Sequence, residues 1–98
     1  MMLILFRCRL REGVDTEMER VGARMYELAS QMPGFISYRD YAAADGEVVT
    51  AIEFESAETL KAWREHPEHR EAQLRGQQEF FSQYRIQVCT VDRDYAFP

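Results

Sequence analysis

The hydrophobic residues of this chain change their spacing along the sequence, and this alternation limits the folds that the chain can adopt. Residues 2–10 form a dense apolar run, which is typical of a strand buried on both faces. In the next segment the apolar residues recur at alternating steps of four and three, as on one face of an α-helix. They are Val14, Met18, Val21, Met25, Leu28 and Met32. The two periods predict a domain that mixes α and β structure.

Signals at both ends of this helical segment indicate where the helix starts and stops. Thr16 followed by Glu19 matches a capping box, in which the two side chains bind free backbone N–H groups of the first turn. Pro33 and Gly34 end the helix, because proline cannot continue it and glycine readily takes the conformation that follows a helix. We therefore expect one helix between these two signals.

The Asp45-Gly46 pair lies between two strand-like runs, residues 35–43 and 48–54. Asp-Gly favours a two-residue hairpin turn, in which both central residues have positive φ. With this loop Ala44 faces Glu47, and the register places Tyr38 opposite Glu53. Cross-strand contact between these last two side chains would follow.

The same register assigns the hairpin side chains to two faces of a sheet. One face carries Phe35, Arg39, Tyr41, Val48, Ile52 and Phe54. The other face carries Ile36, Tyr38, Asp40, Val49 and Glu53. Neither face is purely polar, so we expect something to pack on each.

A second helical region follows Ser56, which is a favourable N-cap residue. Its first apolar residues, Leu60 and Trp63, are out of phase with the later set, which comprises His69, Ala72, Gly76 and Phe80. Proline disfavours helical geometry in the residue before it, so two short helices should meet at His66-Pro67. Each helix would turn its own face inward, and Gly76 would permit a close approach of the backbone.

The last β-like segment, residues 84–95, completes the order β-α-β-β-α-β. This order predicts a ferredoxin-like α+β fold, a four-stranded antiparallel sheet with both helical regions on one face. The first and last strands would be neighbours, which would bring Cys8 and Cys89 into the same region as small buried residues. The uncovered sheet face still carries apolar residues, so we expect a homodimer.

Composition excludes several classes of partner. The chain has 98 residues, enough for a single domain over residues 1–98. Twelve basic residues against seventeen acidic ones give a net charge of −5, which argues against nucleic acid as a partner. Residues 1–6 are too few to span a membrane and lack secretory features. Two cysteines do not form a disulfide framework, so we expect a cytoplasmic protein with reduced thiols.

Three segments together resemble the antibiotic biosynthesis monooxygenase (ABM) family. They are Gly34-Phe35 after the first helix, the strand Val49–Ser56, and the run Trp63-Arg64-Glu65-His66-Pro67-Glu68-His69 before Gly76. The resemblance implies a dimeric α+β barrel, in which two sheets pack face to face and each pocket lies between a sheet and its own helices. Family members with known chemistry include cofactor-independent oxygenases of polyphenolic or quinol substrates.

The resemblance also indicates which residues form the site. It makes Trp63 a wall of the pocket, in both the polyphenol oxygenases and the related haem degraders. The haem-degrading pattern requires an asparagine on the first strand and a histidine about three turns after the tryptophan. This chain has Phe6-Arg7-Cys8-Arg9 and Gln73 instead, so haem degradation is disfavoured. The polyphenol-type pattern has an asparagine one turn before the tryptophan, where this chain has Thr59.

His69 faces inward with its stripe and is the candidate catalytic base, since an imidazole of near-neutral pKa suits removal of a phenolic proton. Trp63, Tyr38, Arg39 and Phe80 are the candidate substrate-binding residues. His66 and His69 have no third ligand at a related spacing, so we expect no metal site. The chain has no nucleotide- or flavin-binding motif, so we expect no cofactor.

Two functions remain open from the sequence. The first is a small cofactor-independent monooxygenase acting on an aromatic phenol or quinol. The alternative is a non-catalytic module of the same fold that binds a small apolar molecule, for example in a stress response. Haem binding through His66 or His69 is a third and less favoured hypothesis.

Overall fold

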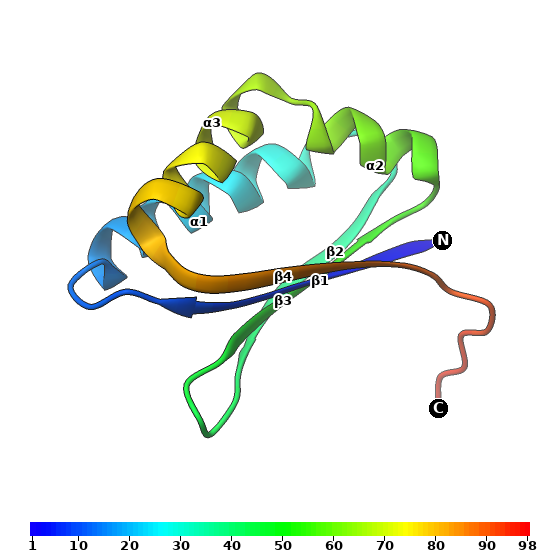
Figure 1. Cartoon of the computed structure of the whole chain (residues 1–98). Coiled ribbons are helices and arrows are strands. Elements are labelled where there is room, and N and C mark those ends of the chain that lie inside the picture. Colours follow the sequence, from blue (N-terminus) through cyan, green and yellow to red (C-terminus); the bar gives the residue numbers. More distant parts are fainter.

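Four strands and three α-helices follow one another in the predicted order, in a computed structural model that describes residues 1–98. The elements are β1 (Met2–Leu10), α1 (Asp15–Ser30), β2 (Phe35–Ala42), β3 (Val48–Phe54), α2 (Ala57–Arg64), α3 (Pro67–Arg75), a π-helical turn (Gly76–Phe80) and β4 (Phe81–Thr90). The strands form one antiparallel sheet in the order β2-β3-β1-β4. All helices lie on one face of it (Figure 1). The fold is ferredoxin-like α+β, as predicted.

The core lies between this sheet face and the helices. Strand β1 is central, and its even-numbered residues face the helices together with those of β3 and β4. Nine buried side chains form the core cluster: Ile4, Val21, Met25, Ala29, Ile52, Phe54, Leu60, Trp63 and Phe80. Two of them, Val21 and Met25, belong to the predicted stripe of α1, and the other four residues of the stripe pack against the cluster, so that periodicity is confirmed. No helix has the length and apolar character needed to cross a membrane.

The two predicted N-caps have different outcomes. Ser56 caps α2 in a true capping box, because its hydroxyl accepts from the backbone N–H of Thr59 and its own N–H donates to Thr59 Oγ1, both at 3.2 Å. The prediction of a capping box at Thr16 and Glu19 was wrong. Helix α1 starts earlier, with Val14 at the N-cap and no side-chain cap, so Thr16 lies inside its first turn.

The hairpin loop contains three residues, not the predicted two. The backbone N–H of Gly46 donates to Ala43 O at 3.0 Å, and that of Ala43 donates to Glu47 O at 2.8 Å. Only Gly46 has positive φ, at 93°. Asp45 stays at negative φ, and its carboxylate accepts from Glu47 N at 3.1 Å and from Arg9 Nη2 at 2.8 Å. A type I turn followed by a left-handed glycine satisfies these bonds, and it replaces the two-residue turn.

The longer loop shifts the hairpin register by one residue and therefore reverses the predicted faces of residues 37–42 relative to β3, whereas Phe35 still pairs with Phe54 across an irregularity in β2. Tyr38 faces Ile52 and points toward the helices, whereas Arg39 faces Ala51 on the open side. The predicted contact of Tyr38 with Glu53 was also wrong. The partner of Glu53 is Ser37, whose hydroxyl donates to Glu53 Oε1 at 2.6 Å.

The two cysteines do not come together, although β1 and β4 are neighbours as predicted. Cys8 pairs with Tyr84 on the helix side, and Cys89 pairs with Leu3. Because side chains alternate along a strand, Cys89 lies on the opposite face of the sheet from Cys8. Both thiols are free, and burial is the main cause that raises the pKa of Cys8 to about 11.

Gly34 and Gly22 should respond differently to substitution by alanine. Gly34 has φ of 82°, and a Cβ there would lie 2.5 Å from Thr59 Cβ, whereas a Cβ on Gly22 in α1 would meet nothing within 4 Å. We expect Gly34→Ala to lower the free energy of unfolding by more than about 1 kcal/mol, since alanine strains a left-handed conformation. Gly22→Ala should raise it by about 0.5–1 kcal/mol. Urea denaturation measures both, and equal effects of the same sign would contradict the assignment.

Candidate functional site

The imidazole of His69 stacks on the indole of Trp63. The two ring centroids are 4.0 Å apart and the planes differ by 11°. Trp63 lies near the end of α2 and His69 in the first turn of α3. The predicted break between the helices is confirmed at His66-Pro67, where His66 caps α3 by accepting from Glu68 N through Nδ1 at 3.2 Å. This break turns the chain so that the two rings lie face to face.

A hydrogen bond fixes which nitrogen of His69 carries the proton. Nδ1 lies 3.1 Å from the carbonyl oxygen of Trp63. A carbonyl oxygen only accepts, so Nδ1 must donate. In the neutral ring Nε2 then holds a free lone pair, and it has no partner among the side-chain hydrogen bonds of the chain. Burial lowers the pKa of His69, against the opposing effect of the bond to Trp63 O, and thereby favours this neutral form.

The indole N–H of Trp63 has no hydrogen-bond partner although it is fully buried. The residue is only 2% exposed. Buried polar groups are nearly always paired, so each exception requires an explanation. The unpaired donor and the free imidazole lone pair belong to two stacked rings, and together they suit a bound molecule that offers an oxygen atom.

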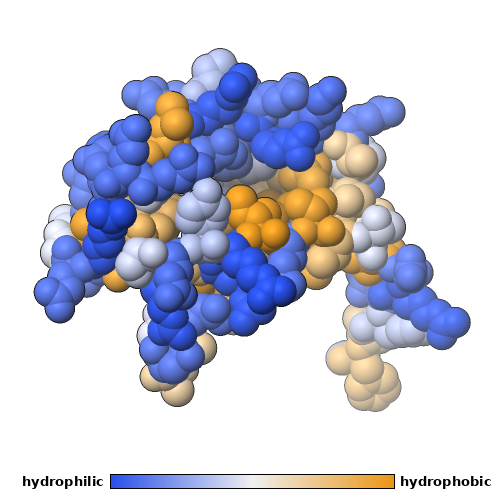
Figure 2. Space-filling model, in the orientation of Figure 1, coloured by the Kyte–Doolittle hydropathy of each residue, from blue (hydrophilic) through white to orange (hydrophobic).

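The helices leave part of the sheet uncovered along β4. Tyr84, Ile86 and Val88 pair in register with Cys8, Phe6 and Ile4 of β1, so they belong to the helix side of the sheet. Yet they are 44%, 51% and 53% exposed. We call these three residues the β4 shelf. Figure 2 shows hydrophobic surface in the recess beneath the helical layer, where Figure 1 places β4.

The π-helical turn brings an aromatic pair to the start of this shelf. Phe80 is 2% exposed, and the guanidinium carbon of Arg75 lies 4.9 Å from the centre of its ring. The expected close approach at Gly76 is confirmed, because a Cβ there would lie 2.4 Å from Phe81 Cε2. Phe81 in turn packs on Phe6, with ring centroids 5.1 Å apart. Single π-helical turns occur frequently at functional sites.

The structure brings three of the five predicted site residues together. Trp63 and Phe80 share the core cluster, and His69 stacks on Trp63. Tyr38 is on the same sheet face but on β2, about 14 Å from β4 across the sheet. It packs edge-on to Tyr26, and burial raises its pKa to about 12. Arg39 lies on the opposite face, over the ring of Tyr41, so we leave it out of the candidate site.

Sequence reasoning did not include the β4 shelf among the site residues. The alternation of Ile86 and Val88 with polar residues was visible as a strand pattern. That pattern could not show that the short α2 and α3 helices stop short of the strand. Exposure depends on where the helices lie, which local periodicity does not encode.

The two main surface hollows differ in their lining. One, of about 170 Å³, lies between α1 and α3 and is lined mainly by charged residues. The other, of about 190 Å³, lies at one end of β1 and β4 and includes Tyr84 of the shelf. Neither is lined by Trp63 or His69. No three metal-ligating side chains come together in the structure.

These features define a class of small ferredoxin-like α+β protein, with buried aromatic side chains between the sheet and its own helices. The family model for antibiotic biosynthesis monooxygenase matches residues 1–75. The uncharacterized protein YqjZ of Bacillus subtilis is 32% identical over 83 residues, which cover 85% of this chain and 73% of that protein. The chain therefore belongs to the antibiotic biosynthesis monooxygenase family.

Solved structures show the same fold at low sequence identity. Rv0793 of Mycobacterium tuberculosis superposes with a TM-score of 0.86 at 18% identity, covering 97% of this chain and 98% of that one. SnoaB, a cofactor-independent oxygenase from Streptomyces nogalater, superposes with a TM-score of 0.78 at 16% identity, covering 95% and 94%. At these identities the likeness extends to the fold alone.

The lowered pKa of His69 predicts a pH dependence of stability. As pH falls through the ordinary histidine pKa of about 6.5, the unfolded chain binds a proton at residue 69 before the folded chain does. The free energy of unfolding of the wild type should therefore fall across this range, and His69→Gln should remove that part of the decrease. Urea denaturation at pH 5 to 8 measures both proteins. Parallel curves would show that His69 titrates normally in the fold.

Proposed function

We propose that this protein is a cofactor-independent monooxygenase, which oxidises an aromatic phenol or quinol held between the β4 shelf and the Trp63–His69 pair. The observation that carries the proposal is the unpaired indole N–H of Trp63, whose ring stacks on a neutral imidazole with a free Nε2. Membership of the family supports it, as does the fold shared with a cofactor-independent oxygenase.

In this mechanism His69 acts as the general base. Its Nε2 lone pair accepts the phenolic proton, while the bond from Nδ1 to Trp63 O holds the ring in the required tautomer. The resulting phenolate is electron-rich enough to reduce dioxygen directly. Over the whole reaction the substrate loses two hydrogen atoms and gains one oxygen atom. The second oxygen atom leaves as water, so the substrate itself supplies all the electrons.

Trp63 acts as the donor to the substrate oxygen. As the proton leaves, negative charge grows on the substrate oxygen. The buried indole N–H has no other acceptor, and its hydrogen bond to this oxygen is strongest when the oxygen is charged. The β4 shelf offers an apolar surface to the aromatic body of the substrate. In this proposal the β4 shelf binds the substrate, and the two stacked rings carry out the chemistry.

The alternative function is non-catalytic binding of a small apolar molecule on the same shelf. One observation favours it: Trp63 and His69 line neither of the two main surface hollows. A binding module needs only the exposed shelf, whereas catalysis requires access to Nε2 of His69. Oxygen consumption separates the two hypotheses.

The catalytic proposal predicts oxygen uptake with quinols or anthrones, measured with an oxygen electrode on purified protein without added metal or flavin. His69→Ala should lower kcat/KM by about 10²–10⁴-fold, the usual contribution of a general base. Trp63→Phe should lower it about tenfold through loss of one hydrogen bond to a charged oxygen.

Lys61→Gln, on the exposed side of α2, is the matched control and should leave the rate unchanged. Unchanged rates in a folded His69→Ala variant would remove its catalytic role. Tight binding without oxygen uptake would favour the alternative.

We also propose that the protein is a homodimer in which the open sheet faces pack together. That face carries Leu3, Leu5 and Arg7 of β1 opposite Glu53, Ala51 and Val49 of β3, all only partly buried in one chain. At its edges Arg39 and Arg85 form no ion pair within the chain. An apolar centre with unpaired charges at its rim suits an interface with a second copy.

The dimer is tested by sedimentation equilibrium. Leu5→Glu puts a charge at the centre of the open face and should reduce the measured mass from that of a dimer to that of a monomer. Gln73→Glu, which adds the same charge to the exposed surface of α3, should leave the mass unchanged. A wild-type monomer at the same concentration would contradict the proposed assembly.

A further inference from the structure

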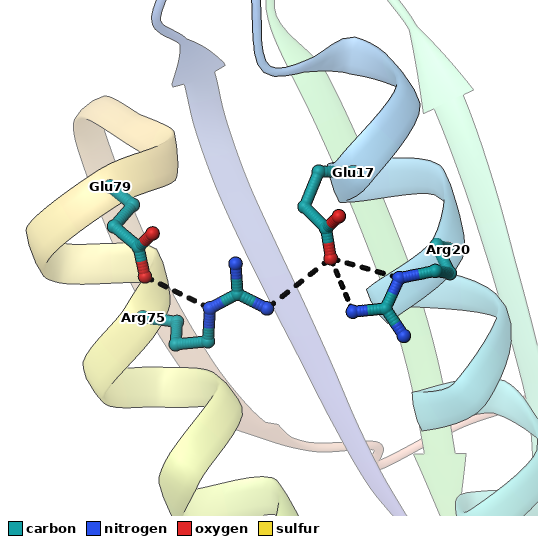
Figure 3. Close-up of polar contacts among 4 residues, drawn as sticks. All are labelled: Glu17, Arg20, Arg75 and Glu79. Atoms are coloured by element: carbon teal, nitrogen blue, oxygen red, sulfur yellow. Dashed lines mark hydrogen bonds and ion pairs between the residues drawn. The ribbon is translucent and has the colours of Figure 1, made fainter.

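Helix α3 carries His69 and contacts the core through Ala72 and through the stack of His69 on Trp63. None of its nine residues is buried. Ion pairs to α1 hold it at both ends. Glu68 in its first turn pairs with Arg24, and Arg75 in its last turn pairs with Glu17 at 3.3 Å. Figure 3 shows Arg75 lying between Glu79 of its own segment and Glu17 of α1.

The pair at the first turn has the geometry of a fork. Arg24 Nε donates to Glu68 Oε2 at 3.0 Å, and Nη2 donates to Oε1 at 2.9 Å. Two parallel hydrogen bonds fix the orientation of the carboxylate as well as its distance. Glu27 holds the guanidinium from the other side, accepting from Nη1 at 2.7 Å. Arg24 is thus aligned within α1 before it reaches α3.

Glu68 immediately precedes His69, and both its side chain and its backbone N–H form hydrogen bonds. Its side chain is bound to Arg24, and its backbone N–H donates to Nδ1 of His66 at 3.2 Å. A shift of Glu68 would therefore move the first turn of α3, and the His69 ring with it. The stack on Trp63 and the bond to its carbonyl depend on that turn.

We propose that Arg24 and Glu68 are positioning residues, which fix the first turn of α3 so that the His69 ring stays stacked on Trp63 with Nε2 free. The relevance of this pair to catalysis rests on the proposed function, whereas its effect on the ring does not. Both side chains are more than 40% exposed, so the pair contributes little to overall stability. Its contribution is to the geometry of the site.

The experiment is proton NMR of the histidine rings, which needs no substrate. The chain has only two histidines, and His66→Asn assigns their signals while keeping a favourable N-cap. In the wild type the ring current of Trp63 should displace the His69 signals upfield. In Arg24→Gln we expect them to move toward the values of a free histidine and to titrate at higher pH, with the unfolding midpoint in urea nearly unchanged.

Two variants separate positioning from a general loss of charge. Arg70→Gln removes the same charge from the exposed surface of α3, where Arg70 forms no ion pair, and should leave the His69 signals in place. The charge-reversed double variant Arg24→Glu/Glu68→Arg should restore them. The proposal fails if Arg24→Gln leaves the signals unmoved, if Arg70→Gln moves them equally, or if the double variant does not restore them. Wild-type oxygen uptake is assayed separately, so inactivity would refute the proposed function alone.

Discussion

Burial of the Trp63 indole holds the helical layer to the sheet, and the site depends on it. The ring contributes to a core shared by α1, α2, the π-helical turn and the two central strands. It also has a polar atom that the core cannot satisfy, and a flat face on which His69 stacks. One side chain therefore supplies packing, an unpaired donor and a platform for the candidate base. A smaller apolar residue would serve only the first of these roles.

The helices are too short to cover the sheet completely, and this limit creates the ligand surface. Helices α2 and α3 have eight and nine residues and meet at a proline, so each spans only about two turns. They lie above the inner strands and leave the helix side of β4 exposed. In a domain of 98 residues, a deep internal cavity would cost core contacts that a small protein needs. A shelf at an open edge avoids that cost.

Charge and apolar packing hold different parts of this site. Apolar contacts fix Trp63 and Phe80, whose positions tolerate little movement. Helix α3 has no buried residue, and ion pairs to α1 hold both of its ends, while the His69 ring is also held by its stack on Trp63 and its bond to Trp63 O. Such exposed pairs are weak and are screened by salt. The donor is therefore held rigidly, whereas the base lies on an element that can respond to its surroundings.

The element order, the helix break at His66-Pro67 and the inward stripe of α1 could all be predicted from the amino-acid sequence. Periodicity and proline act over a few neighbouring residues, so these features need no distant contact. The sequence also placed His69 and Phe80 on an inward face. The hairpin register could not be predicted in this way, because the Asp-Gly pair fits a loop of two residues or of three, and the structure shows the longer loop with a bond from Arg9 to Asp45, 36 residues apart. The tertiary structure was also needed to place Arg39 on the opposite face of the sheet from Trp63. It was needed as well to show the β4 shelf and the unpaired indole N–H. These features depend on distant partners, which no local pattern records.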